Sequence, residues 1–599
     1  MYNHLLSTKK LSIYRLFFLV DKMSKYFKNI ELLSKGVLDA MEVNKDDADY
    51  LASVALSALK VITYADQIEA KKNKTESDHY RKQGERDYSN CYLQRALIYY
   101  NRALAYAPND SLAQKLAYRG RSAVLLSAKL YKASEKDCTT ALGVDCETPK
   151  DVFEDIRQLK FKALSQMRTD DIRAEHNQEL RRSADEFYRL KSHHGSIPCA
   201  SADIDVVIES GVPKVIAKRD IAPSTLVVLE KAFVSWAPKN PDQYFSCYYC
   251  RKLDLNLFPC KGCVAALFCS KECEESCLKE YHSVECKIIG KLQNIKNDEI
   301  WLTRVIIKLR NMCSSWEEFV DLSRDFGMNR MTQDTIKDIF DGTNPKSVFS
   351  FDNSRHFVDG AVFQNSFPCA MILKELLNLQ TFCPKNVRSK LDSMMATARI
   401  LMSLSLYSHT TTLNLITDVS DSVGVGVHTN GHRGLFPFIG KMKHSCVPNV
   451  QKVCINDSIA LVATETIQAG TELTVTHVCH WLENTVSRIE RKRSIFMECH
   501  TVCSCFVCTA SQDDWDKKYR EAQISECLKK RVVDSFNCEL NIIFGKPVKT
   551  LFQEMYQLVS DLRYELFSNE YEIAYQRLGS LHAYMLNKKL NNMVLGLDM

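Results

Sequence analysis

Apolar residues recur at the period of an α-helix over most of the N-terminal third of the chain. Residues 24–190 contain no cluster of prolines, and we expect them to form one helix after another. A pattern of small and bulky positions recurs there at a constant offset, pairing Gly84, Ala96, Tyr100 and Ala103 with Ser122, Ser134, Cys138 and Ala141. Small residues at this spacing allow paired helices to pack closely, and Pro108 ends the first unit.

This pattern resembles tetratricopeptide repeats, and the resemblance covers roughly residues 81–170. The usual unit has about 34 residues, so the longer offset requires about four extra ones, which Asn109–Leu112 supply. Stacks of this kind need about three units for stability, and residues 151–170 are therefore expected to add a partial third. A generic helical bundle is the alternative interpretation.

The pattern changes to short β-branched runs over residues 203–236. These runs end at Gly211–Pro213 and Ala222–Ser224, which predicts antiparallel strands. Helical periodicity returns from about 287 to 410, and strand-like runs return from 422 to 480. The last part is helical, with apolar positions at Leu551, Met555, Leu558, Leu562 and Leu566. The sequence therefore predicts an α+β protein in which a β domain is interrupted by a helical insert.

Composition narrows the possible functions only slightly. A chain of 599 residues is expected to contain about three or four packing units. Its hydrophobic content of 45% is that of a globular protein, and its net charge of +6 comes from acidic and basic residues that are mixed along the chain. Such a distribution does not favour a nucleic-acid-binding protein.

The 24 cysteines are unusual, and they admit two explanations: a secreted disulfide framework or intracellular metal sites. The N-terminal apolar run 11–20 contains Arg15 and lacks a cleavage site, so it predicts an amphipathic helix rather than a signal peptide. A start at Met23 would remove this run. No stretch reaches the roughly 18 apolar residues that span a bilayer. We therefore expect an intracellular protein, in the cytoplasm or the nucleus, with metal-bound thiolates.

The strongest local signal is a block of eight potential metal ligands within residues 247–286. They are Cys247, Cys250, Cys260, Cys263, Cys269, Cys273, His282 and Cys286. Zinc prefers four nitrogen or sulfur ligands in a tetrahedron, and a Cys-x2-Cys pair places two sulfurs on one tight turn. Eight ligands complete two closed sites, which stabilise folding rather than catalyse hydrolysis.

This spacing resembles the MYND zinc finger, including the Phe268–Ser270 and Tyr281–Cys286 pieces. The resemblance implies an interleaved arrangement, with one ion on Cys247, Cys250, Cys269 and Cys273 and the other on Cys260, Cys263, His282 and Cys286. Cys277 would then be a packed thiol. MYND modules bind short proline-rich peptides, so the resemblance also implies a peptide ligand.

Further motifs resemble those of SET methyltransferases. Lys443–Asn449 reads Lys-His-Ser-Cys-Val-Pro-Asn, which is similar to the Asn-His-Ser-Cys-x-Pro-Asn signature, and Gly470–Val475 resembles the Gly-x-Glu-Leu strand that follows it. Residues 217–223 match the opening strands. The resemblance implies a third zinc ion, held by Cys446 together with the post-SET residues Cys503, Cys505 and Cys508.

The order of these motifs resembles the SET and MYND domain family, specifically the insect branch of its fourth member. The resemblance implies a split, β-rich SET domain with an inserted MYND module, between an N-terminal tetratricopeptide-like region and a C-terminal helical region. The expected units are an N-terminal helical region (1–80), helical repeats (81–170), the first SET part (200–238), MYND (247–286), a helical insert (287–420), the second SET part (421–480), a post-SET segment (481–510) and a helical tail (511–599).

The family resemblance implies methyl transfer from S-adenosylmethionine to a lysine of a histone or another protein. The residues aligned with the donor site and the lysine channel are Lys443, His444, His477 and Thr501. The chain departs from the family pattern at four places: Gly211–Lys214 lacks a second glycine, Lys443 replaces asparagine, His477 replaces tyrosine, and Thr501 replaces an aromatic residue.

These departures leave two functions open. His477 is either a proton acceptor, since imidazole titrates near neutral pH, or a residue released from catalytic constraint. The chain is accordingly either a protein-lysine methyltransferase or a non-catalytic adaptor that binds proteins through its repeats and MYND module, for example in transcriptional regulation. A DNA-binding zinc protein is disfavoured, because no basic stripe flanks residues 247–286. Neither a membrane nor direct nucleic-acid binding is expected.

Overall fold

The computed structural model describes most of the chain. The described residues are 48–61, 70–167, 182–209, 211–237, 244–292, 300–324, 332–350, 359–388, 391–415, 432–477, 489, 492–493, 495, 503–511, 523–537, 546–565 and 568–586. The apolar run 11–20, Met23 and Thr501 lie outside them. No helix within the described residues is long and apolar enough to cross a bilayer.

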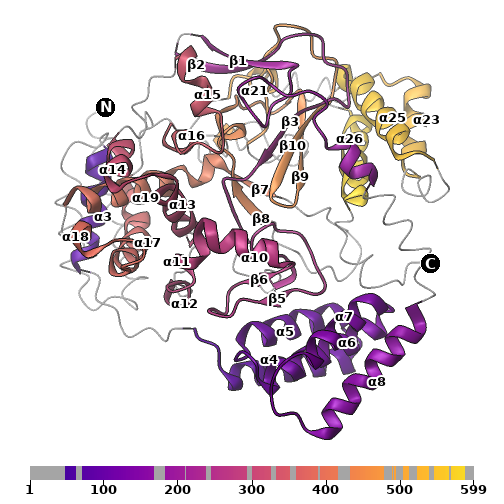
Figure 1. The fold of residues 1–599 in the computed structure, drawn as a ribbon. Helices are drawn as coiled ribbons and strands as arrows, with labels where there is room; N and C mark the ends of the chain where they lie inside the picture. The colour runs from indigo at the N-terminus through magenta and orange to yellow at the C-terminus, as the bar shows by residue number, and fades with distance from the viewer. Residues whose placement is uncertain are drawn as a thin grey trace.

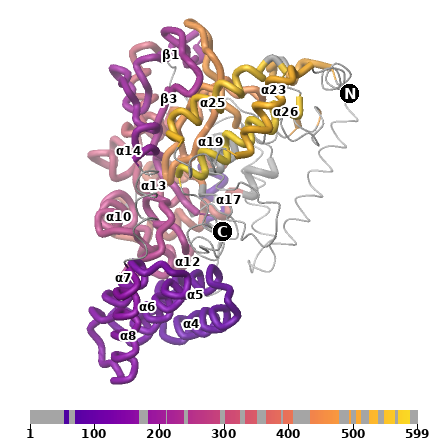
Figure 2. The backbone as a smooth tube through the Cα atoms, turned by 90° about the vertical axis from the view of Figure 1, so that its right-hand side faces the viewer, coloured from indigo at the N-terminus to yellow at the C-terminus, as the bar shows by residue number. Residues whose placement is uncertain are grey.

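The helices between residues 74 and 166 form a stack at one end of the molecule, at the bottom of both Figure 1 and Figure 2. They are α4 (Lys74–Ser89), α5 (Leu93–Tyr106), α6 (Leu112–Ser127), α7 (Tyr131–Leu142) and α8 (Lys150–Gln166). Asn73 and Ser111 begin α4 and α6, because each side chain accepts a hydrogen bond from a backbone N–H of the first turn.

The small residues of the recurring pattern lie where these helices meet. Gly84 of α4 and Gly120 of α6 both face the buried ring of Tyr100 on α5. A Cβ atom at Gly84 would lie 3.1 Å from Cε2 of that ring, so the close approach of α4 depends on the missing side chain. In the second helix pair, the hydroxyl of Ser134 donates to the backbone carbonyl of Ser122 over 2.8 Å. The pattern therefore marks two helical hairpins, α4–α5 and α6–α7.

A buried polar contact joins this stack to the cysteine-rich block. Arg121 of α6 pairs with Asp137 of α7, with 2.6 Å between Nε and Oδ2, and their side chains are 0% and 1% exposed. Arg121 also donates from Nη1 to the carbonyl of Leu257 over 2.8 Å. Asn256 donates to Oδ1 of the same aspartate over 2.8 Å. The ion pair that closes the α6–α7 hairpin therefore also fixes the position of residues 256–257.

Strands from the two sides of the cysteine-rich block pair with one another. In one sheet β3 (Leu226–Lys231) and β9 (Val450–Ile455) flank β10 (Ser458–Ala463); in the other, β4 (Val234–Trp236) and β7 (Thr412–Leu415) flank β8 (His432–Leu435). The pairing is antiparallel, with Ile459 opposite Glu230 and Val234 opposite Leu435. A separate hairpin contains β1 (Ile204–Glu209) and β2 (Val212–Ala217). Segments that lie far apart in the sequence thus form one β domain, as expected for the α+β class.

The insert between these strands is helical and packs beside them (Figure 1). Its longer helices are α13 (Ile300–Met312), α14 (Trp316–Arg324), α17 (Asp359–Asn378) and α19 (Leu391–Thr411). Its short helices are η5 (Gln333–Thr335), α15 (Ile336–Ile339), α16 (Lys346–Phe349) and α18 (Lys385–Arg388). The indole of Trp301 stacks on that of Trp236, with ring centroids 4.9 Å apart, which joins the insert to β4. β-Branched Thr411 and Thr412 mark the change to strand, so β7 lies inside the segment 287–420 expected to be helical.

An N-terminal helix completes the insert. α3 (Ala48–Val61) contacts α17 and α19 rather than the helical stack that follows it in the sequence. Its alanines Ala52, Ala55 and Ala58 are fully buried, and their spacing places them on one face of the helix. The first described helix therefore packs on two helices from the second half of the chain.

The C-terminal helices cover the other side of the β domain. They are α23 (Glu526–Ser535), α25 (Val548–Asp561), η7 (Leu562–Glu565) and α26 (Asn569–Met585). The predicted apolar stripe on α25 is buried at Leu551, Met555 and Leu558, whereas Leu566 lies outside the described residues. Tyr556 of α25 donates to the side-chain oxygen of Gln451 on β9 over 3.3 Å, which anchors the helices to the sheet.

Candidate functional site

The cysteine-rich block brings its eight predicted ligands together in two groups of four. Its scaffold consists of β5 (Phe258–Pro259), β6 (Leu267–Phe268), α10 (Lys271–Cys277), η4 (Leu278–His282), α11 (Ser283–Glu285) and α12 (Ile289–Leu292). One group contains Cys247, Cys250, Cys269 and Cys273; the other contains Cys260, Cys263, His282 and Cys286. The grouping is the interleaved one that the sequence resemblance implies. Within each group all ligand atoms lie within 4.8 Å of one another.

The separations between these atoms fit a tetrahedral metal site. The Sγ atoms of Cys250 and Cys269 are 3.7 Å apart, and those of Cys260 and Cys286 are 3.8 Å apart. Zinc–sulfur bonds of about 2.3 Å in a tetrahedron require sulfurs about 3.8 Å apart, whereas a disulfide would bring them to about 2.05 Å. The donor set and the spacing therefore fit zinc at both groups.

A buried carboxylate orients the histidine ligand of the second group. Nε2 of His282 lies 3.6 Å from Sγ of Cys263, and Nδ1 lies 2.8 Å from Oε2 of Glu285. Arg304 of α13 donates to the other carboxylate oxygen over 2.7 Å and also to the backbone carbonyl of Ser235 in β4. Burial would raise the pKa of Glu285, but the Arg304 charge and His282 lower it to about 2. This carboxylate therefore links the metal group to the helical insert and to the β domain.

A third group lies on the opposite side of the molecule from the helical stack. It contains Cys446, Cys503, Cys505 and Cys508, all within 4.8 Å of one another. Sγ of Cys446 lies 3.9 Å from that of Cys503 and 3.4 Å from that of Cys508, which again fits a tetrahedral site better than a disulfide. The short helix α21 (Phe506–Thr509) carries the last ligand. This group ties the signature segment to the post-SET segment.

The signature segment 443–449 lies against the segment 471–477. The backbone N–H of Ser445 donates to the carbonyl of Val475 over 2.9 Å, and the N–H of Val475 donates to the carbonyl of Lys443 over 3.0 Å. The side-chain amide of Asn449 donates to the carbonyl of Glu472 over 3.0 Å and accepts from the N–H of Thr474 over 2.9 Å. Backbone bonds between β2 and residues 471–473 complete the arrangement.

This crossing brings His444 and His477 together. Their ring centroids are 6.0 Å apart, and the backbone N–H of His477 donates to Nδ1 of His444 over 3.0 Å. Burial lowers the pKa of His444 to about 4, so this imidazole is neutral at pH 7. Nε2 of His477 lies 2.8 Å from the carbonyl of Met442 and must donate to it, so Nδ1 carries the lone pair of its neutral form. The crossing thus fixes the orientation of both imidazoles by hydrogen bonds.

Lys443 does not place an isolated charge beside the histidines. Its ammonium lies 3.0 Å from the carboxylate of Glu472, and the lysine side chain is 56% exposed. The paired carboxylate offsets the charge that would oppose a sulfonium donor. Gly211 has φ +80°, a conformation that favours glycine at the β1–β2 turn. Thr501, the fourth of the substituted positions, lies outside the described residues.

Two buried charged residues next to the site were not identified from the sequence. Glu230 on β3 accepts hydrogen bonds from the backbone N–H groups of Phe438 and Ile439, at 2.7 and 2.8 Å. Lys441 donates to the carbonyl of Ser347 over 2.6 Å. Burial raises the pKa of Glu230 and lowers that of Lys441, each to about 7. The available signal was a single lysine within the otherwise apolar run 435–442.

Comparison with known proteins agrees with this geometry. Residues 214–478 match the SET domain family, and this range contains both halves of the β domain and the histidine pair. The chain is 21% identical to the protein-lysine N-methyltransferase SMYD4 of Pongo abelii over 70% of its own length and 62% of that protein. The chain contains a SET domain and is similar to members of the SET and MYND domain family. It spans about three fifths of the length of this SMYD4 relative.

Other members of the SET and MYND family show the same level of similarity. SMYD4 of Gallus gallus is 21% identical over 66% of this chain and 67% of that protein. The human histone-lysine N-methyltransferase SMYD3 is 24% identical over 46% of this chain and 55% of that protein. The likeness to the fourth member therefore extends across most of this chain, while the expected insect branch stays a prediction.

Proposed function

We propose that this chain is a protein-lysine N-methyltransferase of the SET class, acting on a lysine of a histone or another protein. The observation that carries the proposal is the crossing of residues 443–449 with 471–477, which holds His444 and His477 side by side within the SET domain. The relatives named as lysine methyltransferases support the choice of reaction. We expect slow turnover, since several family positions are substituted.

The residues that would hold S-adenosylmethionine are the turn at Gly211, the signature residues Lys443 and His444, and Thr501. The bound donor supplies an electrophilic methyl group. A target lysine must lose its ammonium proton before its amine can attack, and Nδ1 of His477 accepts that proton. The backbone bond from His477 to His444 and the bond from its ring to the carbonyl of Met442 fix the orientation of the acceptor.

The metal groups support a finer assignment of the scaffold. We infer that residues 247–286 form a MYND-type module with two zinc ions and that Cys446, Cys503, Cys505 and Cys508 hold a third. The hairpins α4–α5 and α6–α7, with α8, are tetratricopeptide-like repeats interrupted by the extended connection at 107–111. A proline-rich peptide is a candidate ligand of the MYND-type module, and residence in the cytoplasm or nucleus stays a prediction.

Calorimetry with S-adenosylmethionine tests the proposal directly. We expect measurable heat of binding at micromolar to high micromolar ligand, followed by transfer of radiolabelled methyl groups to a protein substrate. The variant His477→Ala should lose transfer while it retains donor binding, because only the proton acceptor is removed. The exposed His193→Ala is the matched control. Absence of heat at high micromolar donor would refute the enzymatic proposal.

A non-catalytic adaptor is the second candidate, favoured by the substitutions at Lys443 and Thr501 and by the buried contact between the helical stack and residues 256–257. In that case the immobilised chain would capture partner proteins through the MYND-type module. Capture would not require S-adenosylmethionine. The variant Cys260→Ser should abolish capture. Capture that survives this variant would assign binding to the repeats alone.

A further inference from the structure

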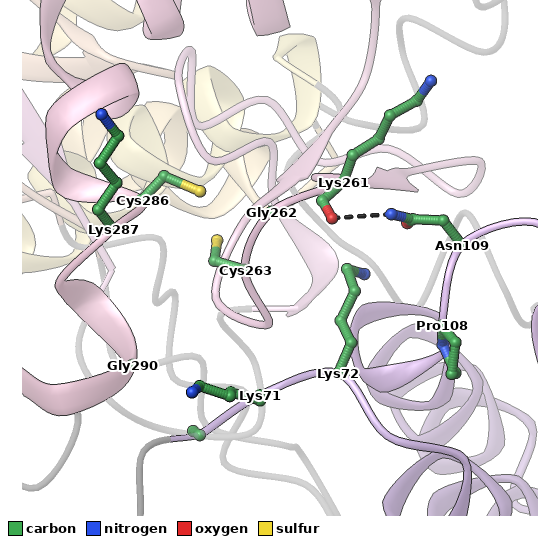
Figure 3. A pocket seen from close by; sticks show the side chains of 11 residues that line it. Lys71, Lys72, Pro108, Asn109, Lys261, Gly262, Cys263, Cys286, Lys287 and Gly290 are labelled. Carbon is green, nitrogen blue, oxygen red and sulfur yellow. Dashed lines mark hydrogen bonds between the residues drawn. The ribbon is translucent and has the colours of Figure 1, made fainter.

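A cavity of about 450 Å³ lies between the helical stack and the second metal group. Its walls come from the segment 70–72 before α4, the loop 108–109 after α5, the loop 261–263, and residues 286–290 (Figure 3). This volume lies within the roughly 300–1,000 Å³ that is usual for ligand pockets. None of these residues takes part in the histidine crossing, so the cavity is separate from the proposed methyl-transfer site.

The cavity is held open by hydrogen bonds between its walls. The side-chain amide of Asn109 donates to the carbonyl of Lys261 over 2.9 Å, drawn as a dashed line in Figure 3. On the other side, the backbone N–H of Ala70 donates to the carbonyl of Gly290 over 3.3 Å. Lys72 is fixed between them, because its ammonium donates to the carbonyls of Ala105 and Ala107 at 2.9 and 3.3 Å. The cavity is therefore formed before any ligand binds.

Its lining carries positive charge and no carboxylate. The charged residues of the lining are Lys71, Lys72, Lys261 and Lys287. Zinc on three thiolates and a neutral histidine would carry one net negative charge, which the half-buried Lys72 beside those thiolates offsets. The positive charge of Lys261 and Lys287 attracts an anion. In a chain whose acidic residues nearly equal its basic ones, a cavity lined by four lysines and no carboxylate selects for negative charge.

The positions of the ammonium groups indicate the kind of anion. In Figure 3 the side chains of Lys261 and Lys287 extend to opposite sides, so their nitrogens do not converge on one point. A single phosphate group would be surrounded by convergent donors, and the cavity lining contains no arginine that could bind one in a two-point fork. Separated cations instead match separated carboxylates along an extended chain. A nucleic-acid duplex would require a basic surface that continues beyond the cavity.

We propose that this cavity binds a short acidic segment of a partner protein, with aspartate or glutamate side chains reaching Lys261 and Lys287. The repeat stack and the MYND-type module then act as one composite docking site, because each supplies part of the wall. The proposal does not depend on methyl transfer. Binding at the cavity and donor binding at the SET domain are separately measurable.

Fluorescence anisotropy of the full chain with a labelled peptide of alternating aspartate and glutamate tests the proposal. The equal-length asparagine–glutamine peptide is the control ligand. We expect the acidic peptide alone to bind, and its affinity to fall steeply as salt rises, since exposed charges are screened within about 8 Å at physiological ionic strength. The double variant Lys261→Gln/Lys287→Gln should weaken binding about tenfold. The exposed Lys162→Gln on α8 should leave the affinity unchanged.

The zinc content and melting temperature of the double variant are compared with those of the unaltered chain. If they are equal, the lower peptide affinity comes from the missing charges and not from unfolding. Equal binding of the neutral peptide, or an unchanged affinity in the double variant, would overturn the proposal. Displacement of the peptide by inorganic phosphate at matched ionic strength, or by a single-stranded oligonucleotide below the peptide concentration, would also overturn it. None of these outcomes depends on whether S-adenosylmethionine binds.

Discussion

Single buried charges link the metal groups and the histidine pair to the surrounding core. Glu285 illustrates this, because one carboxylate orients a metal-ligating imidazole and also accepts from Arg304 of the helical insert. Glu230 plays a comparable part beside the signature segment, where it accepts two backbone N–H groups. Removing either carboxylate leaves buried donors without a partner, which usually costs about 1–3 kcal/mol for each. A variant at Glu285 is expected to change zinc affinity, and a variant at Glu230 is expected to change the pH dependence of stability.

The variant Glu285→Gln should weaken zinc at the second group by about tenfold to a hundredfold, since the histidine loses its charged partner. Competition with a chromophoric chelator measures this affinity. The matched control is Glu275→Gln, an exposed position on α10. Equal zinc affinity in both variants would show that the carboxylate does not position His282.

The variant Glu230→Gln should change the pH dependence of stability. The folded pKa of about 7 lies above the ordinary value of 4.5, so between these pH values the folded protein retains a proton that the unfolded chain releases. The contribution of Glu230 to stability is therefore present below about pH 4.5 and is lost as the pH rises to 7. Between pH 5 and pH 7 the difference in unfolding free energy between the variant and the wild type should change by about 2 kcal/mol, which melting experiments detect as a changing difference in Tm. A constant gap, as expected for the exposed Glu186→Gln, would contradict the assignment.

At the scale of helices and strands, the helical stack depends on close approach and on one buried ion pair. Gly120 shows the first requirement, because a Cβ atom there would lie 2.5 Å from Cζ and 2.9 Å from Cδ1 of Tyr100. Arg121 shows the second, because it joins α6 to α7 and to residue 257. Sequence periodicity located these helices, but it did not show that α6 contacts the metal-binding block.

The variant Gly120→Ala should destabilise the stack by about 1–2 kcal/mol, because steric overlap with the buried ring exceeds the helix-propensity gain of about 1 kcal/mol. Gly579→Ala within α26 is the matched control. No atom lies within 4 Å of its added Cβ, so this variant should gain about 0.5–1 kcal/mol. Urea unfolding followed by circular dichroism measures the change in unfolding free energy of each variant. If the two changes have the same sign, the packing argument is refuted.

The variant Arg121→Met should cost about 3–5 kcal/mol, because it leaves the carboxylate of Asp137 buried without its cation. Arg119→Met is the control on the same helix. Its pair with Asp155 is 39% and 40% exposed, so its loss should cost less than about 1 kcal/mol. Limited proteolysis should cut the stack much faster in the first variant, and equal rates would count against the proposed joint.

For the molecule as a whole, we expect three zinc ions for each chain. The variant Cys503→Ser should leave two, since the other two groups share no ligand with it. The exposed Cys527→Ser should retain all three. Native mass spectrometry counts the ions directly. Two ions in the unaltered chain would show that the third group is a cluster of thiols, and the melting temperature would then not fall in Cys503→Ser.

The sequence predicted features that depend on local spacing. Ligands such as Cys247 and Cys250 are separated by a fixed short turn, and the short β-branched runs in 203–236 predict strands, so both could be found without coordinates. Other features depend on contacts between segments that are distant in the chain. These are the pairing of β3 with β10, the position of Glu230 and the cavity at Lys72. Hydrophobic periodicity carries no information about which distant partner an element contacts. The approach of Glu472 to Lys443 likewise became visible only in three dimensions.

The position of α3 has a consequence for synthesis on the ribosome. About half of the chain separates its end at Val61 from the start of α17 at Asp359, and its buried alanines require α17 and α19. At roughly 5–20 residues per second, the helix waits about 15–60 seconds before its partners emerge. During that interval its apolar face has no native surface to cover it, whereas the neighbouring helical stack can complete its hairpins from adjacent sequence. The nascent chain therefore exposes a binding site for chaperones at its oldest end, and the helical insert can close only in the last third of translation.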